Sequence, residues 1–149
     1  MNRLFQSFGR VSLVLPLALL IVVGCATTNG SSQQSMKVTL SGSQEVPPVK
    51  TSATGSATVM IKSDKSVSGT ITTTGIDAIA AHIHDGPAGK NGPVIVPFTK
   101  ASDGTWSIAP GAKLSDAQYA SYLAGNLYVN VHSAANKAGE IRGQIKPIK

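Results

Sequence analysis

From residue 36 onward, apolar and polar residues alternate in short stretches separated by glycine, proline and small polar residues. A period of two is typical of β-strands, because successive side chains of a strand point to opposite faces of its sheet. The stretches also have the length of ordinary strands. The pattern predicts strands over residues 36–40, 53–61, 67–74, 79–84, 94–98, 105–108, 127–132 and 140–145.

The segments between these stretches predict turns and one helix. Residues 63–66 favour a hairpin between the second and third strands. Residues 114–123 favour a helix, because Ser115 and Gln118 have the spacing of a capping box and Gly125 suits a left-handed helix end. Many short strands with one short helix predict an all-β fold, an antiparallel β-sandwich.

The first 24 residues have the layout of a signal peptide. Residues 1–10 form a short basic segment with Arg3 and Arg10. An almost wholly apolar run over residues 11–23 follows it. That run is shorter than the roughly 20 apolar residues that a spanning helix needs. The sequence VVGC at residues 22–25 resembles a bacterial lipobox, which implies cleavage before Cys25 and transfer of a diacylglycerol to its thiol. We expect residues 1–24 to be a lipoprotein signal peptide.

Cys25 is the only cysteine, so the chain has no internal disulfide. An uncleaved anchor or a buried free thiol are the alternatives to lipidation. Residues 25–35 then form the acylated cysteine and a flexible polar tether, and residues 36–149 form the folded domain. Acyl chains would hold the protein on a membrane. Ala26, in place of Asp, usually accompanies sorting of such lipoproteins to the outer membrane, so we expect a lipid-anchored protein of the cell envelope.

Charge and composition argue against nucleic-acid binding. The formal net charge is +6, but Arg3 and Arg10 lie in the leader and the lysines are scattered singly. Aromatic residues make up only 5% of the chain, so few side chains could stack on nucleic-acid bases. We expect a solvated basic surface and no nucleic-acid partner.

The chain has three histidines, and their spacing places them on strand faces. His82 and His84 are two residues apart and therefore point the same way, while Ile79, Ala81 and Ile83 point the other way. His132 ends a strand whose aliphatic residues likewise face away from it. If the two strands are neighbours in one sheet, three imidazoles converge on its outer surface.

Three neutral imidazole nitrogens suit Cu(II) or Zn(II), with one coordination position left for water or a nearby side chain. Cu(I) also binds imidazole, although the thiolate and thioether ligands that favour it are missing from these motifs. Protonated imidazole cannot bind a metal, so affinity should fall below about pH 6.5. A solvated histidine pair without a ligand is the alternative. No nucleophile–base pair or pair of carboxylates points to catalysis.

Four further residues are candidates for supporting this site. Asp85 adjoins His84 and could accept a hydrogen bond from an imidazole N–H. Glu140 and Arg142 share a face of the last strand, where Arg142 could steer an anion toward the metal while paired with Glu140 or Glu45. In the alternative reading, Glu45 and Arg142 form a structural ion pair.

Several sequence blocks together resemble the chordin-type (CHRD) domain family. The blocks are LSGSQEVPP (40–48), AAHIH (80–84) with the Gly- and Pro-rich loop after it, NGPV (91–94), GNLYVNVH (125–132) and AGEIRGQ (138–144). The resemblance runs from about residue 37 to 145. It implies a β-sandwich of immunoglobulin-like or superoxide-dismutase-like character, as found in bacterial secreted proteins and in an animal extracellular antagonist of growth factors. It implies no settled biochemical activity.

The histidines are also similar to the copper ligands of copper–zinc superoxide dismutases, which lie on a His-x-His strand and a later Val-His strand. The bridging and zinc-binding histidines of those enzymes have no counterpart here, and neither has their disulfide. We therefore expect one copper or zinc ion bound by His82, His84 and His132. An adhesive module that binds an envelope protein, and a single-copper protein that handles superoxide, are the alternatives.

Overall fold

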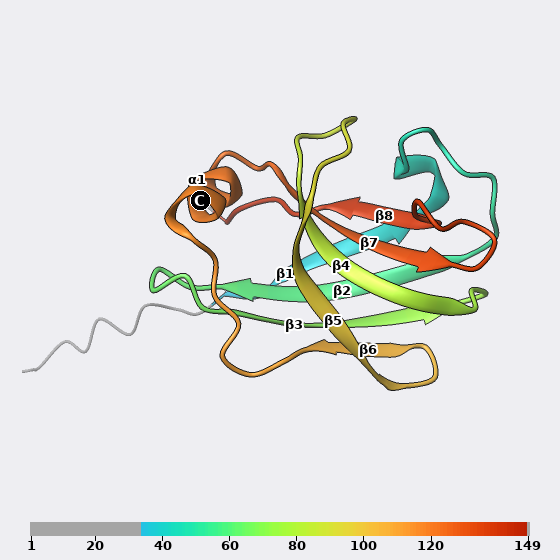
Figure 1. Cartoon of the computed structure of the whole chain (residues 1–149), viewed down its shortest axis with the longest axis horizontal. Coiled ribbons are helices and arrows are strands. Elements are labelled where there is room, and N and C mark those ends of the chain that lie inside the picture. Colours follow the sequence, from blue (N-terminus) through green and yellow to red (C-terminus); the bar gives the residue numbers. More distant parts are fainter. Residues whose placement is uncertain (1–33, 149) are drawn as a thin grey trace, which may run out of the picture. The chain divides into compact units, whose positions relative to one another are not determined.

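The structure is a computed structural model that describes residues 34–148. Its strands and helices are shown in Figure 1. In chain order they are β1 (Met36–Ser41), the 3-10 helix η1 (Gly42–Gln44), β2 (Thr54–Ile61), β3 (Val67–Thr74), β4 (Ala78–Asp85), β5 (Val94–Ser102), β6 (Thr105–Ile108), α1 (Asp116–Leu123), β7 (Leu127–Ser133) and β8 (Ile141–Gln144). Each stretch with alternating apolar and polar residues therefore forms a strand, as the sequence predicts.

The strands form one antiparallel sheet that closes on itself in the order β1-β2-β3-β6-β5-β4-β7-β8. The expected all-β class with one short α-helix is confirmed, as is the β2–β3 hairpin. The expected immunoglobulin-like or superoxide-dismutase-like sandwich of two sheets is wrong, because β1 and β8 pair and join the two ends of the sheet into a barrel. Alternation along a strand shows which face is buried, but it is the same in a sandwich and in a barrel.

Closure depends on a close approach between β1 and β8. Ser41 pairs with Arg142, and the neighbouring Gly143 lies directly against β1. A Cβ atom at Gly143 would lie 2.4 Å from the main-chain oxygen of Thr39 and 2.6 Å from Cγ1 of Val38. Glycine is therefore required here for the two strand ends to meet.

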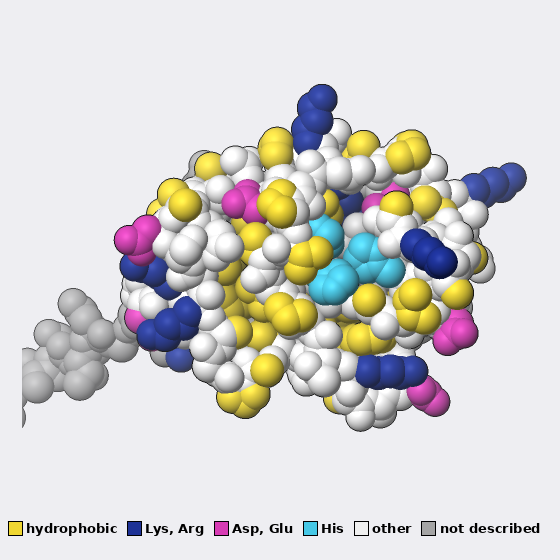
Figure 2. Space-filling view, viewed as in Figure 1, with side chains coloured by type: hydrophobic (Ala, Val, Ile, Leu, Met, Phe, Trp, Pro, Cys, Tyr) yellow, Lys and Arg dark blue, Asp and Glu magenta, His cyan; other side chains and the backbone are white. Residues whose placement is uncertain are grey.

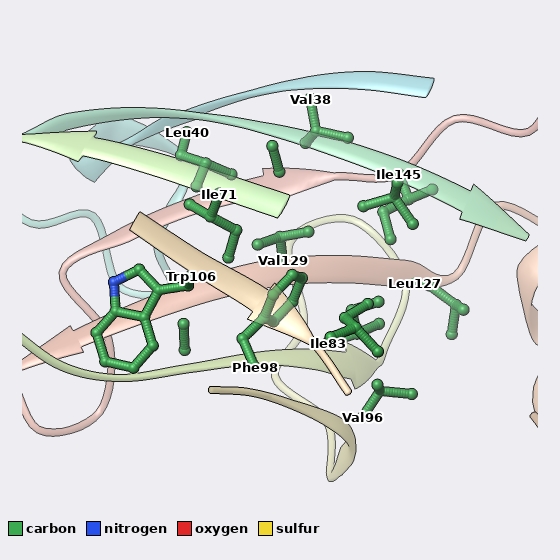
Figure 3. Packing of buried hydrophobic residues seen from close by; sticks show 14 of the residues in the cluster. Val38, Leu40, Ile71, Ile83, Val96, Phe98, Trp106, Leu127, Val129 and Ile145 are labelled. Carbon is green, nitrogen blue, oxygen red and sulfur yellow. The ribbon is translucent and has the colours of Figure 1, made fainter. Parts of the chain in front are cut away.

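The inward faces of the strands form one hydrophobic core (Figure 3). Leu40, Ile71, Ile83 and Val129 come from four different strands and have no exposed surface. Full burial of such a side chain stabilises the fold by about 1.5–3 kcal/mol. Because β4 and β7 contribute Ile83 and Val129 to this core, the opposite faces of the same strands must turn outward.

The helix α1 forms as its capping signals predict, although it begins at Asp116. Ser115 and Gln118 make both bonds of the capping box, since the Gln118 N–H donates to Ser115 Oγ and the Ser115 N–H donates to Gln118 Oε1. Gly125 adopts the left-handed conformation, with a φ of 76°. Tyr122 is buried, whereas Leu123 is exposed.

None of the helices within residues 34–148 is both long and apolar enough to cross a membrane. The expected signal peptide over residues 1–24, the lipidation site Cys25 and all but the last two residues of the expected tether lie outside the described residues. β1 begins at Met36, where the sequence predicts the first strand.

The contact at Gly143 predicts a large effect of one added methyl group. Gly143→Ala should lower the free energy of unfolding by about 3 kcal/mol, the upper end for overpacking, because the obstacle is main chain of β1 rather than a movable side chain. Denaturant unfolding monitored by circular dichroism measures the change.

Gly111→Ala is the matched control for this substitution. Gly111 has a φ of 85°, and no atom lies within 4 Å of an added Cβ. Its replacement should cost only about 1 kcal/mol, from the left-handed backbone conformation. An equal loss of stability in both variants would contradict the role of Gly143 in closure.

Candidate metal centre

The antiparallel pairing of β4 with β7 brings the three histidines together. In this register Ala80 lies opposite His132, His82 opposite Asn130, and His84 opposite Tyr128. All three imidazoles therefore rise from the outer face of the same strand pair, as the sequence predicts. One expectation for this face is wrong: Ile79 is 55% exposed instead of facing the core, because the register shifts between Ala78 and Ala80.

The imidazoles form a compact cluster, seen as the cyan group on the face shown in Figure 2. His82 Nδ1 lies 3.1 Å from His132 Nε2. The ring centroids of His82 and His132 are 4.9 Å apart, and that of His84 is 5.6 Å from His82 and 5.8 Å from His132. One nitrogen from each ring can be chosen so that all three lie within 4.8 Å of one another. Convergence of the three rings is therefore confirmed.

Main-chain carbonyls determine which nitrogen carries the proton in two of the rings. His84 Nδ1 is 2.9 Å from the carbonyl oxygen of Gly92, and His132 Nδ1 is 3.0 Å from that of Lys137. A carbonyl oxygen only accepts hydrogen bonds, so both Nδ1 atoms must donate. The Nε2 atoms of His84 and His132 are then unprotonated, the form in which imidazole binds a metal, and that of His132 accepts a hydrogen bond from His82 Nδ1.

The Nε2 atom of His84 is buried and has no hydrogen-bond partner among residues 34–148. A buried polar nitrogen without a partner costs about 1–3 kcal/mol, so such atoms are rare in folded proteins. His132 Nε2 faces His82 instead. A cation bound among the three rings would give His84 Nε2 the partner that the protein does not supply.

Burial keeps the cluster uncharged. The pKa of His82 falls from 6.5 to about 4, chiefly because burial disfavours the charged ring and secondly because His132 and His84 lie beside it. Burial also lowers the pKa of His84 and of His132. The imidazoles are therefore neutral at pH 7, and protons should compete for the ligand nitrogens at a lower pH than the 6.5 expected from the free side chain.

Arg142 lies on the histidine face and contacts several neighbouring groups. It pairs with Asn130 across β7 and β8 and is only 2% exposed. Its guanidinium carbon lies 3.4 Å from the ring centroid of Tyr128, whose other side stacks on His84 with centroids 4.9 Å apart. Its N–H groups donate to the main-chain oxygens of Pro87 and Lys90 and to the side-chain oxygen of Asn91.

The hydrogen bonds of Arg142 fix the loop over residues 86–93. The Tyr128 hydroxyl also lies 3.1 Å from the Gly92 nitrogen, which donates to it. This loop carries the Gly92 carbonyl that accepts a hydrogen bond from His84 Nδ1. Arg142 and Tyr128 therefore help to position His84 through the loop. The contacts of Arg142 thus support a positioning role, and the expected steering of anions stays a prediction.

None of the three expected acidic residues makes a hydrogen bond to an imidazole within residues 34–148. Asp85 makes no side-chain hydrogen bond to a histidine within residues 34–148. The carbonyl oxygens of Gly92 and Lys137 accept the imidazole hydrogen bonds instead. Glu140 accepts hydrogen bonds from Thr51 and Ser133 and so ties the loop before β2 to the end of β7. Burial alone would raise the pKa of Glu140, but hydrogen bonds from Ser133, Thr51 and Asn136 hold it below its usual value.

Glu45 is buried near Arg142 without forming an ion pair. Among residues 34–148 the ion pairs within 4.0 Å are Lys65–Asp116 and Lys100–Asp103, so the expected Glu45–Arg142 contact is absent. Burial raises the pKa of Glu45 to about 7, and the charge of Arg142 offsets this only in part.

Two kinds of supporting group were missed by sequence reasoning. Tyr128 was placed on the histidine face by its alternation with His132, but nothing in the pattern showed that its ring stacks on His84. The carbonyls of Gly92 and Lys137 have no sequence signal, because the path of each loop decides where a main-chain oxygen points. Both loops end beside the cluster only after β4, β7 and β8 have paired.

The lowered pKa of His82 predicts that the metal-free protein loses stability in acid. Between pH 6.5 and about 4 the unfolded chain binds a proton at this residue that the folded chain does not, so the free energy of unfolding falls as the pH is lowered. Chemical denaturation at pH 7 and pH 5 measures this fall. His82→Gln removes the titrating group and should lose less stability over the same interval.

Glu45 acts in the opposite direction, because its raised pKa makes the folded chain the better proton binder between pH 4.5 and about 7. It is present in both proteins, so its effect cancels in the comparison. An equal loss of stability in wild type and His82→Gln would show that His82 titrates as an ordinary exposed histidine.

Comparison with known proteins agrees with the resemblance seen in the sequence blocks. The family model for the CHRD domain matches residues 36–145, which includes every strand of the barrel and all three histidines. No curated protein and no solved structure matches the chain. Because the match covers well over half of the sequence, the chain belongs to the CHRD domain family.

Proposed function

We propose that this protein is a lipid-anchored CHRD-domain protein of the cell envelope that binds a single copper or zinc ion through His82, His84 and His132. The observation that carries the proposal is the state of the ring nitrogens. Carbonyl oxygens accept hydrogen bonds from Nδ1 of His84 and His132, so Nε2 of both rings is unprotonated. Nε2 of His84 is buried without a partner, and Nε2 of His132 accepts a hydrogen bond from His82 Nδ1 that a bound ion would replace.

The spacing of the rings supports this proposal. Three nitrogens that each lie about 2.0–2.1 Å from one ion can be at most about 4.2 Å apart. The ligand nitrogens lie within 4.8 Å of one another. Small rotations of the side chains would bring them to bonding distance, and His82, which is the most exposed of the three rings, has the most freedom to make them. Three ligands leave a coordination position open for water or another small ligand.

A docking role is the second candidate function, and exposed apolar side chains favour it. Val94 lies opposite His84 across β4 and β5 and is 50% exposed, and Ile79 on β4 is 55% exposed. An envelope protein could bind either of these exposed apolar side chains without using the histidines. The alternative of a single-copper protein that handles superoxide would need both copper and the open coordination position.

Metal titration of the full-length protein in detergent separates these functions. The wild type should bind one equivalent of Cu(II) or Zn(II) in isothermal calorimetry. The double variant His82→Ala/His84→Ala should bind at least about 100-fold more weakly, because it loses two of three ligands rather than an outer partner, whose loss alone costs about 10–100-fold.

Asp85→Asn is the control for this titration. Asp85 adjoins His84 in the sequence but makes no hydrogen bond to an imidazole within residues 34–148. The control should bind metal as the wild type does. Equal, weak binding by the wild type and the double variant would reject the metal site and leave the docking role. A copper-loaded wild type without dismutase activity would reject the superoxide role.

The membrane anchor rests on the lipobox-like residues 22–25 and is tested separately. Intact-mass spectrometry of the wild type should show a chain that begins at Cys25 and carries acyl groups. Cys25→Ala should retain residues 1–24 and carry no lipid, because the thiol that receives the diacylglycerol is missing. Ser31→Ala, in the tether, should be processed like the wild type. An unmodified Cys25 in the mature wild type would reject the anchor.

A further inference from the structure

A buried positive charge lies one aromatic ring away from the candidate metal centre. The guanidinium carbon of Arg142 is 3.4 Å from the centroid of the Tyr128 ring, and the same ring stacks on His84 at 4.9 Å with an interplanar angle of 12°. Arg142 is 2% exposed and Tyr128 is 1% exposed. Water therefore does not separate this cation from the ligand ring, and its field is screened far less than that of a surface lysine.

No contact with a carboxylate neutralises this charge. Within residues 34–148, no acidic oxygen lies within ion-pair distance of Arg142. Its donors go to neutral oxygens, which are the main-chain carbonyls of Pro87 and Lys90 and the side-chain amides of Asn91 and Gln144. These bonds satisfy its N–H groups and leave the net charge in place.

The groups around the three histidines add little negative charge. The imidazoles are neutral ligands, and none of the influences on their pKa values comes from a carboxylate. Arg142 itself contributes to lowering the pKa of His84. Glu45 is 5% exposed, and burial raises its pKa to about 7, so at neutral pH it offsets only part of the charge of Arg142.

We propose that the three-histidine centre binds copper preferentially as Cu(I), and discriminates against Cu(II) and Zn(II), because the buried guanidinium of Arg142 opposes the second positive charge of a divalent ion. This inference rests on the proposed function and adds the identity and charge state of the ion. At a separation on the order of 10 Å and an effective dielectric constant of about 20, one unit charge changes the ratio of monovalent to divalent binding by roughly tenfold. Burial of the rings acts in the same direction, because desolvation costs more for the ion of higher charge.

The test compares the affinities of the full-length protein for Cu(I), Cu(II) and Zn(II). Competition with a chromogenic Cu(I) chelator under anaerobic, reducing conditions gives the first value, and competition with chelators of the divalent ions gives the other two. Arg142→Gln should lower the ratio of Cu(I) to Cu(II) affinity roughly tenfold, which corresponds to a fall of about 59 mV in the reduction potential of the bound ion. Arg142→Lys retains a positive charge and should keep the ratio close to that of the wild type.

Lys146→Gln is the matched control, since it removes one positive charge from the same end of the chain at an exposed position. Solvent screens that charge, so the ratio should not change. If all proteins bind no metal, the proposed function itself fails. If the wild type binds metal and Arg142→Gln remains folded but keeps the wild-type ratio, the metal centre stands and the role of the Arg142 charge is overturned.

A second variant covers the case in which Arg142→Gln does not fold. Glu45→Gln at pH 8 removes the negative charge that partly offsets Arg142 and leaves the hydrogen bonds of Arg142 intact. It should raise the ratio of Cu(I) to Cu(II) affinity severalfold. A ratio that stays constant or falls in this variant would overturn the inference.

Discussion

The antiparallel ladder between β4 and β7 determines both the core and the histidine cluster of this protein. The register that places Ile83 opposite Val129 in the core also places His82 opposite Asn130 and His84 opposite Tyr128 on the other face. A slip of one residue would exchange the two faces, moving aliphatic side chains into the outer layer and imidazoles into the core. The hydrophobic effect that fixes the register therefore also fixes the positions of the ligand candidates.

Sequence reasoning reached those parts of the structure that depend on alternation along a single strand. The strand positions, the helix cap at Ser115 and the shared face of the three histidines all follow from local pattern. Closure of the barrel could not be deduced, because it depends on a contact between β1 and β8 that a sandwich would lack. The exposure of Ile79 and the carbonyl partners of the imidazoles were also out of reach, since a register shift and two loop paths decide them.

The outer face of β4, β7 and β8 is itself covered by loops, and this makes it a buried polar layer. Three of the four buried side-chain atoms without a hydrogen-bond partner in residues 34–148 belong to this layer or adjoin it: His84 Nε2, Asn130 Oδ1 and Glu45 Oε1. An added Cβ at Gly139 would meet the Asn130 amide at 2.5 Å and Glu45 Oε1 at 2.7 Å, so the three residues are packed together. Unsatisfied groups tend to remain where function requires them, and one of the three here is a nitrogen of the histidine cluster.

The closed order of the strands has a consequence for neighbouring copies of the protein. A sheet that ends in an unpaired strand presents free N–H and C=O groups, onto which a second molecule can add its own strand. In residues 34–148 every strand has a partner on both sides. Molecules held close together would therefore offer one another few unpaired strand edges on which a shared sheet could grow.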